Sequence, residues 1–272
     1  MTLPDTIHPA LRAALARKGY ETLTDVQGAV LADDAFGQDL LVSAQTGSGK
    51  TVAFGLAMAP DLLGDNEKLP FSQSPLALVI APTRELALQV QRELGWLYGD
   101  AGARIASAVG GMDPRAERRA MERGAHIIVG TPGRLKDHIE RGALDLSSIR
   151  AIVLDEADEM LDFGFREDLE FILGSAPEER RTLLFSATVS KEIARIAQTY
   201  QSDAVRISTI SQGSQHADIA YVVHAVAPRD RENAVINVLR YHGAPRALVF
   251  CGTREAVNRT AARLANRGFA SV

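Results

Sequence analysis

With 272 residues, 46% of them hydrophobic and 24% charged, the chain has the size and composition of one large or two ordinary soluble globular domains. Its formal net charge of −4 does not by itself point to nucleic acid, although phosphate contacts need only a local basic track. A single cysteine, Cys251, excludes an intrachain disulfide and fits a reducing, cytoplasmic compartment. We find neither a signal peptide nor an apolar run of the roughly 18 residues that span a bilayer, so no membrane partner is expected.

Short β-branched runs alternate along the chain with amphipathic helical stretches. The apolar runs predict strands at 39–43, 76–81, 104–108, 125–129, 150–154, 181–185 and 204–207. The segments between them predict helices at 50–62, 84–98, 114–121, 132–141, 166–174 and 190–200. Runs that are apolar throughout are typical of strands buried on both faces. The alternation therefore predicts an α/β fold, a parallel sheet flanked by helices, whose ligands bind at the carboxyl ends of the strands.

A polar, low-complexity segment at 208–217 separates this region from the rest of the chain, and we interpret it as an interdomain linker. After it, the pattern predicts a strand at 219–226, a helix at 230–241, a strand at 246–251 and a helix at 253–267. The predicted organisation is a first domain at 1–207, the linker at 208–217 and a partial second domain at 218–272.

Residues 44–51 (AQTGSGKT) lie between a predicted strand and a predicted helix, which is the context that a phosphate-binding loop requires. Gly47 and Gly49 let the backbone turn its N–H groups around phosphate oxygens, and the helix that begins near Lys50 adds its positive end. Lys50 is predicted to reach the β- and γ-phosphates, and the Thr51 hydroxyl to ligate Mg²⁺. The predicted nucleotide-binding residues of this loop are Ala44, Gln45, Thr46, Gly47, Ser48, Gly49, Lys50 and Thr51.

An acidic motif, DEAD at 155–158, directly follows the predicted strand at 150–154. Asp155 is predicted to hold Mg²⁺, and Glu156 to orient and deprotonate the attacking water while Lys50 absorbs developing charge. A solvated acidic helix start would also place carboxylates here, but the position directly at a strand end favours a site. Lys50, Asp155 and Glu156 are therefore the predicted catalytic residues of a nucleotide hydrolase.

Together these motifs resemble, in order, those of the DEAD-box ATP-dependent RNA helicases of superfamily 2, of the bacterial type. The matching segments are 44–51 (Walker A), 81–86 (motif Ia, APTREL), 110–111 (the glycine doublet), 131–134 (motif Ib, TPGR), 155–158 (motif II) and 186–188 (motif III, SAT). The resemblance implies a RecA-like fold of the P-loop NTPase class. It also implies ATP and Mg²⁺ as cofactors, RNA as partner, and the coupling of ATP hydrolysis to remodelling of RNA duplexes.

Two arginines, Arg84 and Arg134, follow predicted strand ends, and Thr131 opens a helix. Guanidinium groups, hydroxyls and helix N-terminal amides are typical contacts to a phosphate backbone, and such contacts carry no base specificity. An isolated arginine is otherwise more often part of a surface salt bridge. With Gly111 of the glycine doublet, these residues are the predicted RNA-binding set.

Residues 19–27 (GYETLTDVQ) resemble the Q motif of the family, which selects adenine. The amide of Gln27 both donates and accepts, so it can pair with adenine N7 and N6, and Tyr20 is predicted to stack on the base. Leu23 and Asp25 stand where the family usually has prolines, and no aromatic residue precedes Tyr20.

The resemblance also gives a coupling role to the motif at 186–188. Ser186 and Thr188 are expected to connect the acidic motif with the RNA side through hydroxyl hydrogen bonds that involve Asp158. A different group, the arginines between Arg115 and Arg123, alternates with Glu117 and Glu122, and we interpret it as a solvated helix face rather than a second RNA track.

Members of the family have two similar α/β domains and hydrolyse ATP between them. Of the motifs in the second domain, only residues 250–253 (FCGT) resemble one, and no His-Arg-x-Gly-Arg sequence occurs. We therefore expect the chain to stop part-way into the second domain, in a tail of 55 residues (218–272) that is too short for a good independent core. The chain should bind ATP but hydrolyse it slowly, because the arginine-finger motif of the second domain does not occur in it and such an arginine is worth roughly 10³–10⁵ in turnover.

Two other functions stay open. One is a non-enzymatic, ATP-gated RNA clamp, against which Glu156 argues because a pure clamp needs no base. The other is a DNA helicase or translocase with a related core, against which the Q-like segment and the DEAD spelling argue. The sequence does not identify the RNA substrate, protein partners or oligomeric state.

Overall fold

A computed structural model of the chain describes residues 3–209 and 220–271. The chain divides into two compact units, Met1–Gly213 and Ser214–Val272. Most of the predicted linker, 210–217, lies outside the described residues, whereas Ser208 ends a strand of the first unit. Within the described ranges no helix is long and apolar enough to cross a membrane.

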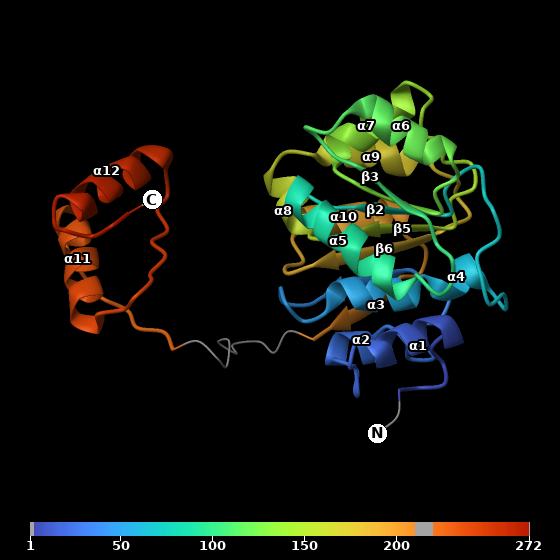
Figure 1. Cartoon of the computed structure of the whole chain (residues 1–272), viewed down its shortest axis with the longest axis horizontal. Coiled ribbons are helices and arrows are strands. Elements are labelled where there is room, and N and C mark those ends of the chain that lie inside the picture. Colours follow the sequence, from blue (N-terminus) through green and yellow to red (C-terminus); the bar gives the residue numbers. More distant parts are fainter. Residues whose placement is uncertain (1–2, 210–219, 272) are drawn as a thin grey trace. The chain divides into compact units, whose positions relative to one another are not determined.

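The predicted alternation of strands and helices is confirmed in the first unit, drawn from blue to orange in Figure 1. Each predicted strand is present, and its ends lie within two residues of the predicted ones. The elements are α1 (Pro9–Arg17), α2 (Asp25–Ala29), β1 (Leu40–Ser43), α3 (Lys50–Ala57), α4 (Ala59–Leu63), β2 (Ala77–Ile80), α5 (Arg84–Leu97), β3 (Ile105–Ala108), α6 (Pro114–Glu122), β4 (Ile127–Gly130), α7 (Pro132–Glu140), β5 (Ala151–Leu154), α8 (Ala157–Asp162), α9 (Arg166–Ser175), β6 (Arg181–Ser186), α10 (Lys191–Tyr200) and β7 (Val205–Ser208).

The predicted helix at 50–62 is instead two helices, α3 and α4, that meet at Met58. Pro60 explains the break, because proline lacks a backbone N–H and its ring clashes with the carbonyl four residues earlier. Helices α1, α2 and α8 were not predicted. Of these, α2 and α8 have only five and six residues, too few for a helical period to stand out.

The seven strands form one sheet in the order β3-β4-β2-β5-β6-β1-β7, and every neighbouring pair is parallel. Residues in alternate positions face opposite sides, so Leu40 and Val42 join one core cluster and Leu41 the other. The first cluster includes buried residues of α1 to α5, and the second those of α6 to α10. Burial on both faces explains why the central strands β2, β4 and β5 are apolar throughout, whereas the edge strands β3 and β7 are buried only in part.

Parallel pairing brings the carboxyl ends of all strands to one edge of the sheet, here called the carboxyl edge. Four of the predicted motifs, which begin at Ala44, Ala81, Thr131 and Asp155, start there as extensions of strands, and a backbone hydrogen bond connects the first residue of each to the neighbouring strand. These bonds are Ala44 N to Ser186 O (3.1 Å), Ala81 N to Gly130 O (3.0 Å), Thr131 N to Ala108 O (3.0 Å) and Asp155 N to Ile80 O (2.9 Å). The strand order places the ends of β3, β4 and β2 in one half of the edge and those of β5, β6 and β1 in the other.

The second unit contains a short 3-10 helix, η1 (Pro228–Asp230), followed by α11 (Arg231–His242) and α12 (Arg254–Ala265). Both predicted helices are confirmed. The predicted strands at 219–226 and 246–251 are wrong wherever the structure describes them, since residues 220–226 and 246–251 form no strand. Val223 and Phe250 are 93% and 91% exposed. Strand propensity expresses packing against neighbours, and in the described part of this unit these segments have no strand to pair with.

At the opposite end of β6 from the site, the buried side chain of Arg181 holds several segments of the first unit together. It donates to the carbonyls of Gln38 (2.9 Å) and Ala57 (2.7 Å) and forms an ion pair of 2.9 Å with Asp61 on α4. Burial raises the pKa of Asp61, and the guanidinium of Arg181 opposes that shift. Removing a partner from such a pair leaves a buried charge without compensation.

We predict that Arg181→Met lowers the free energy of unfolding by about 3 kcal/mol, because it leaves Asp61 and the carbonyls without a donor. Arg118→Met is the matched control, since Arg118 pairs with Glu122 on the exposed face of α6 and should contribute less than about 1 kcal/mol. Denaturant unfolding measures both variants, and equal small losses would contradict the assigned role of Arg181.

Candidate nucleotide site and nucleic-acid interface

The loop between β1 and α3 has the backbone shape that its glycines predict. Gly47 and Gly49 have φ of 83° and 89°, in the left-handed region that glycine adopts most easily, and Gly49 is the N-cap of α3. A β-carbon at Gly49 would lie 2.5 Å from Nε2 of Gln27, so a side chain there would also have to displace the Gln27 amide. The N-terminal amides of α3 are thereby presented at the carboxyl edge, where such amides bind anions.

A buried ion pair connects the two halves of the predicted site. Lys50 Nζ donates to Glu156 Oε1 at 2.8 Å and to the carbonyl of Ala44 at 3.3 Å. Thr46 Oγ1 donates to the same carboxylate oxygen at 3.4 Å. Because β6 lies between β1 and β5, this contact spans two strand spacings of the sheet. The two predicted motifs are therefore brought together, 106 residues apart in the chain.

Glu156 has a backbone conformation that is unusual for its residue type. Its φ and ψ of 51° and 53° lie in the left-handed region, and it is the N-cap of α8. For a residue other than glycine, this conformation costs roughly 1–3 kcal/mol and is found most often at functional sites. The strain turns the chain between β5 and α8 so that the Glu156 carboxylate reaches Lys50.

The adjacent Asp155 is almost fully buried, and its Oδ1 has no hydrogen-bond partner among the described residues. Burial, followed by the negative charge of Glu156, raises its pKa to about 7, although Lys50 acts in the opposite direction. Ser48 Oγ and Asp158 Oδ1 are further buried oxygens of the two motifs without a partner among the described residues. A buried carboxylate without a partner is suited to a cation, which would supply the missing compensation.

These residues fit a magnesium ion. Mg²⁺ is usually bound by one or two carboxylates together with substrate phosphates and waters, rather than by a full cage of protein ligands. Asp155 supplies a carboxylate, and Thr51, in the first turn of α3, supplies a hydroxyl. The described residues contain no group of three or more His, Cys, Asp or Glu side chains arranged for a metal.

Gln27 is a buried side chain that binds the backbone of the phosphate loop between β1 and α3. It is only 1% exposed, its Oε1 accepts from Thr24 N at 3.0 Å in a capping box of α2, and its Nε2 donates to Gly49 O at 3.3 Å. The ring of Tyr20 lies 6.0 Å from that of Trp96, and its stacking on a base stays a prediction. The Q-like segment thus contacts the phosphate loop directly through Gln27, a connection that sequence reasoning missed.

The predicted hydrogen bond between the acidic motif and the motif at the end of β6 is present. Asp158 Oδ2 accepts from both the backbone N and the Oγ1 of Thr188, each at 2.9 Å. Ser186 Oγ donates to the carbonyl of Thr188 at 2.6 Å. Burial acts to raise the pKa of Asp158, but hydrogen bonds from Ser186 and Thr188 outweigh it and hold the pKa below its usual value.

In the other half of the carboxyl edge, the predicted RNA-binding residues come together. Gly111 has φ of 79°, and a β-carbon there would lie 2.8 Å from Arg84 Nη1, so the turn allows close approach of the arginine. Arg84 Nη2 also lies 3.6 Å from Met112 Sδ. Thr131 occupies the N-cap position of α7 without a capping hydrogen bond from its side chain.

Arg134 forms an ion pair with the buried carboxylate of Glu117, which sequence reasoning missed. Arg134 Nε donates to Glu117 Oε2 at 2.8 Å. Glu122 on the same helix is exposed and pairs with Arg118, as expected for a solvated face, but that expectation is wrong for Glu117. Glu117 and Met121 are one helical turn apart and are the buried residues of α6, so an acid on the apolar stripe was the available signal.

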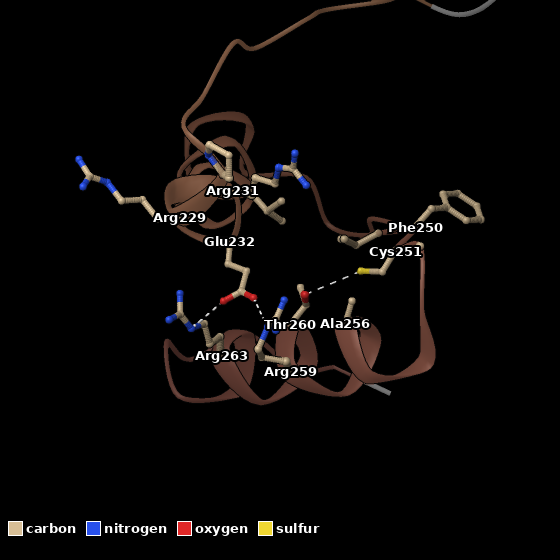
Figure 2. Close-up of a pocket in the computed structure, with 13 residues that line it drawn as sticks. Arg229, Arg231, Glu232, Phe250, Cys251, Ala256, Arg259, Thr260 and Arg263 are labelled. Carbon is tan, nitrogen blue, oxygen red and sulfur yellow. Dashed lines mark hydrogen bonds and ion pairs between the residues drawn. The ribbon is translucent and has the colours of Figure 1, made fainter.

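The second unit has a pocket of about 590 Å³ of its own, shown in Figure 2. Glu232 of α11 points toward α12 and pairs with Arg259 (2.5 Å) and Arg263 (2.7 Å). Cys251 Sγ lies 3.7 Å from Thr260 Oγ1. None of the predicted site residues lines this pocket.

The sequence of the chain also matches that of a known protein family. A profile described as DEAD/DEAH box helicase matches residues 24–196, which include both halves of the edge. The chain belongs to the DEAD/DEAH box helicase family.

Relatives within the family agree with this assignment. The chain is 38% identical over 260 residues to the DEAD-box ATP-dependent RNA helicase CshA of Bacillus licheniformis, covering 95% of this chain and 52% of that protein. It is 37% identical over 262 residues to the CshA of Bacillus subtilis, with 96% and 52% covered. A crystal structure of a DEAD box protein from Methanococcus jannaschii matches with a TM-score of 0.67 and 34% identity over 99% of this chain and 70% of that one. The chain thus spans about half the length of the curated relatives it matches.

We predict that Asp155 makes the stability of this family member fall with rising pH. In the folded chain Asp155 keeps its proton up to a pKa of about 7, against a usual value of 3.8. Between these two values the folded state binds more protons than the unfolded state, so stability decreases as pH increases. Asp155→Asn removes this term. Without magnesium, the melting temperature of the parent should fall relative to the variant up to about pH 7 and then stay level. A constant difference would show that Asp155 ionises normally.

Proposed function

We propose that this chain carries the ATP-binding and RNA-binding part of an ATP-dependent RNA helicase. The observation that carries the proposal is the buried Lys50–Glu156 ion pair, which joins a phosphate-binding loop to a candidate base at the carboxyl edge. The relatives are described as ATP-dependent RNA helicases, which supports the same chemistry here.

ATP binding is assigned to the loop at 44–51 and the N-terminus of α3. Amides of the loop and of the helix would surround the phosphates, and Lys50 would exchange the Glu156 carboxylate for the β- and γ-phosphates. For the base, the Gln27 amide still has one N–H and one oxygen lone pair after its bonds to Thr24 and Gly49. These remaining groups are the ones we assign to adenine, with Tyr20 as the neighbouring aromatic ring.

Hydrolysis is assigned to Glu156. Once Lys50 has turned to the phosphates, the Glu156 carboxylate is free to orient a water molecule and accept its proton. Asp155 and Thr51 would hold Mg²⁺, which when bound neutralises negative charge on the phosphates. The strained backbone at Glu156 keeps its carboxylate at the end of β5, next to the phosphate loop.

RNA binding is assigned to the half of the carboxyl edge formed by β3, β4 and β2. Arg84, Gly111, Thr131 and the amides that begin α7 offer a guanidinium, a close-approach turn, a hydroxyl and a helix N-terminus. All of these contact phosphates rather than bases, so we expect no sequence specificity. Competition between RNA and DNA strands of one sequence tests the choice of RNA, because only RNA offers a 2′-hydroxyl.

Coupling between the two halves is assigned to Asp158, Ser186 and Thr188. β6 lies between the strands that carry the loop and the acidic motif, and its end is bonded to both, through Ser186 O to Ala44 N and through Thr188 to Asp158, so these bonds are the ones we assign to coupling. We also infer a cytoplasmic location, which the single cysteine supports.

Slow hydrolysis by this chain alone is part of the proposal. In the family, arginine fingers belong to a His-Arg-x-Gly-Arg type of motif, and no such sequence occurs in this chain. An arginine directed at the transition state is worth roughly 10³–10⁵ in turnover. RNA-stimulated turnover at the rate of an intact helicase would contradict this part of the proposal.

We predict that Glu156→Gln lowers the rate of ATP hydrolysis by roughly 10²–10⁴, because the amide cannot accept the proton of the attacking water. Single-turnover hydrolysis of radiolabelled ATP, with protein in excess, measures even a slow parent rate. Glu159→Gln is the matched control, an exposed acid three residues further along whose loss should leave the rate unchanged. Equal rates for parent and Glu156→Gln would favour a non-enzymatic, ATP-gated clamp.

A further inference from the structure

Glu117 is a buried carboxylate that accepts hydrogen bonds from three donors, one in the turn after β3 and two on α7. Its side chain, on α6, is 4% exposed. Oε1 accepts from the backbone N of Val109 at 2.8 Å, and Oε2 accepts from Arg134 Nε at 2.8 Å and from His138 Nε2 at 2.7 Å. One side chain thus connects α6 with the turn after β3 and with the first two turns of α7.

The connected segments are the two that we assign to RNA. Val109 directly precedes the Gly110-Gly111 turn, and Arg134 lies in the first turn of α7, next to Thr131. A charge so deeply buried is retained only where its partners compensate it, so the three donors and the carboxylate hold each other in place. The relative position of the turn and the helix start therefore depends on Glu117.

Arg134 is held from two sides by this arrangement. Nε is bound to Glu117, and Nη2 donates to the carbonyl of Met112 at 2.7 Å. Nη1 lies 4.0 Å from Asp137 Oδ2, beyond hydrogen-bond distance. These two bonds fix the orientation of the planar guanidinium and leave the Nη1 amino group without a hydrogen bond. One remaining amino group suits a single directed contact with a phosphate better than a bidentate one.

Met112 extends the connection to the other arginine. Its carbonyl accepts from Arg134, and its sulfur lies 3.6 Å from Arg84 Nη2. Gly111, next to it, has the close approach to Arg84 described above. Displacing the Val109–Met112 turn would therefore move the surroundings of both predicted phosphate-binding arginines at once.

We infer that Glu117 is a positioning residue for the RNA backbone: it fixes Arg134 and the Val109–Met112 turn so that their donors meet successive phosphates. This inference rests on the proposed function, since it needs RNA at this half of the carboxyl edge. Glu117 itself does not contact the phosphates.

The sign of the charge effect separates this role from simple electrostatics. Neutralising an acid near a phosphate-binding surface removes repulsion and by itself strengthens RNA binding. If Glu117 positions the donors, Glu117→Gln must weaken binding instead, because an amide cannot accept from both Val109 N and Arg134 Nε at its two ends. Glu122→Gln is the matched control, with the same change in charge on the exposed face of the same helix.

The experiment measures the affinity of the full chain for a fluorescent single-stranded oligouridine by anisotropy, with a non-hydrolysable ATP analogue and Mg²⁺ present. We expect Glu117→Gln to weaken RNA binding about tenfold, the equivalent of one charge-assisted hydrogen bond, and Glu122→Gln to leave it unchanged or slightly stronger. Affinity for the labelled ATP analogue should be the same in all three proteins, which a general loss of structure would not allow.

Arg134→Lys is a second single variant that tests the same arrangement even if Glu117→Gln is poorly folded, and where both fold, the double variant completes a double-mutant cycle. Lysine keeps the charge but cannot bridge Glu117 and the Met112 carbonyl, so Arg134→Lys alone should also weaken RNA binding. The two losses together should be smaller than their sum, because both break one arrangement. Undiminished RNA binding by both single variants, or strictly additive losses, would overturn the inference. A parent chain that does not bind oligouridine would instead overturn the proposed function itself.

Discussion

The buried contact between Lys50 and Glu156 is the interaction on which the rest of the site depends. Neither group tolerates burial alone, so each fixes the other, and through them the loop after β1 is held against the strand end that carries the acidic motif. The arrangement also requires the left-handed backbone at Glu156, whose conformational cost is balanced by the ion pair. In the proposed function, triphosphate oxygens would offer Lys50 an anionic partner equivalent to the Glu156 carboxylate.

The sheet order explains why one such contact can affect the whole carboxyl edge. β6 lies between β1 and β5, and its end contacts both motifs, through Ala44 N on one side and Asp158 on the other. On the far half of the edge, Glu117 repeats the same physical solution with Arg134 in place of lysine. Both halves are thus organised around a buried carboxylate and its cation, and neighbouring parallel strands connect them.

The sequence was informative wherever a feature is local. Buried parallel strands are apolar on both faces, so the ends of the strands could be predicted within two residues. The glycines of the phosphate loop likewise predicted a backbone with positive φ, which Gly47 and Gly49 have. The buried contacts of Glu117, Arg181 and Gln27 escaped prediction because their partners are distant in sequence, and a charged or amide side chain is usually solvated. The strands predicted around Val223 and Phe250 failed for the converse reason, since a strand exists only with a neighbour.

The affinity for ATP of Glu156→Gln, measured with Mg²⁺ by calorimetry, tests the central claim most directly. If Lys50 must leave Glu156 to reach the phosphates, replacing the carboxylate by an amide removes a competitor, and ATP should bind about tenfold more tightly than to the parent. Glu159→Gln, which removes a nearby exposed charge without touching Lys50, should change the affinity far less. Unchanged or weaker ATP binding by Glu156→Gln would contradict the account, because Lys50 would then not have to exchange one partner for the other.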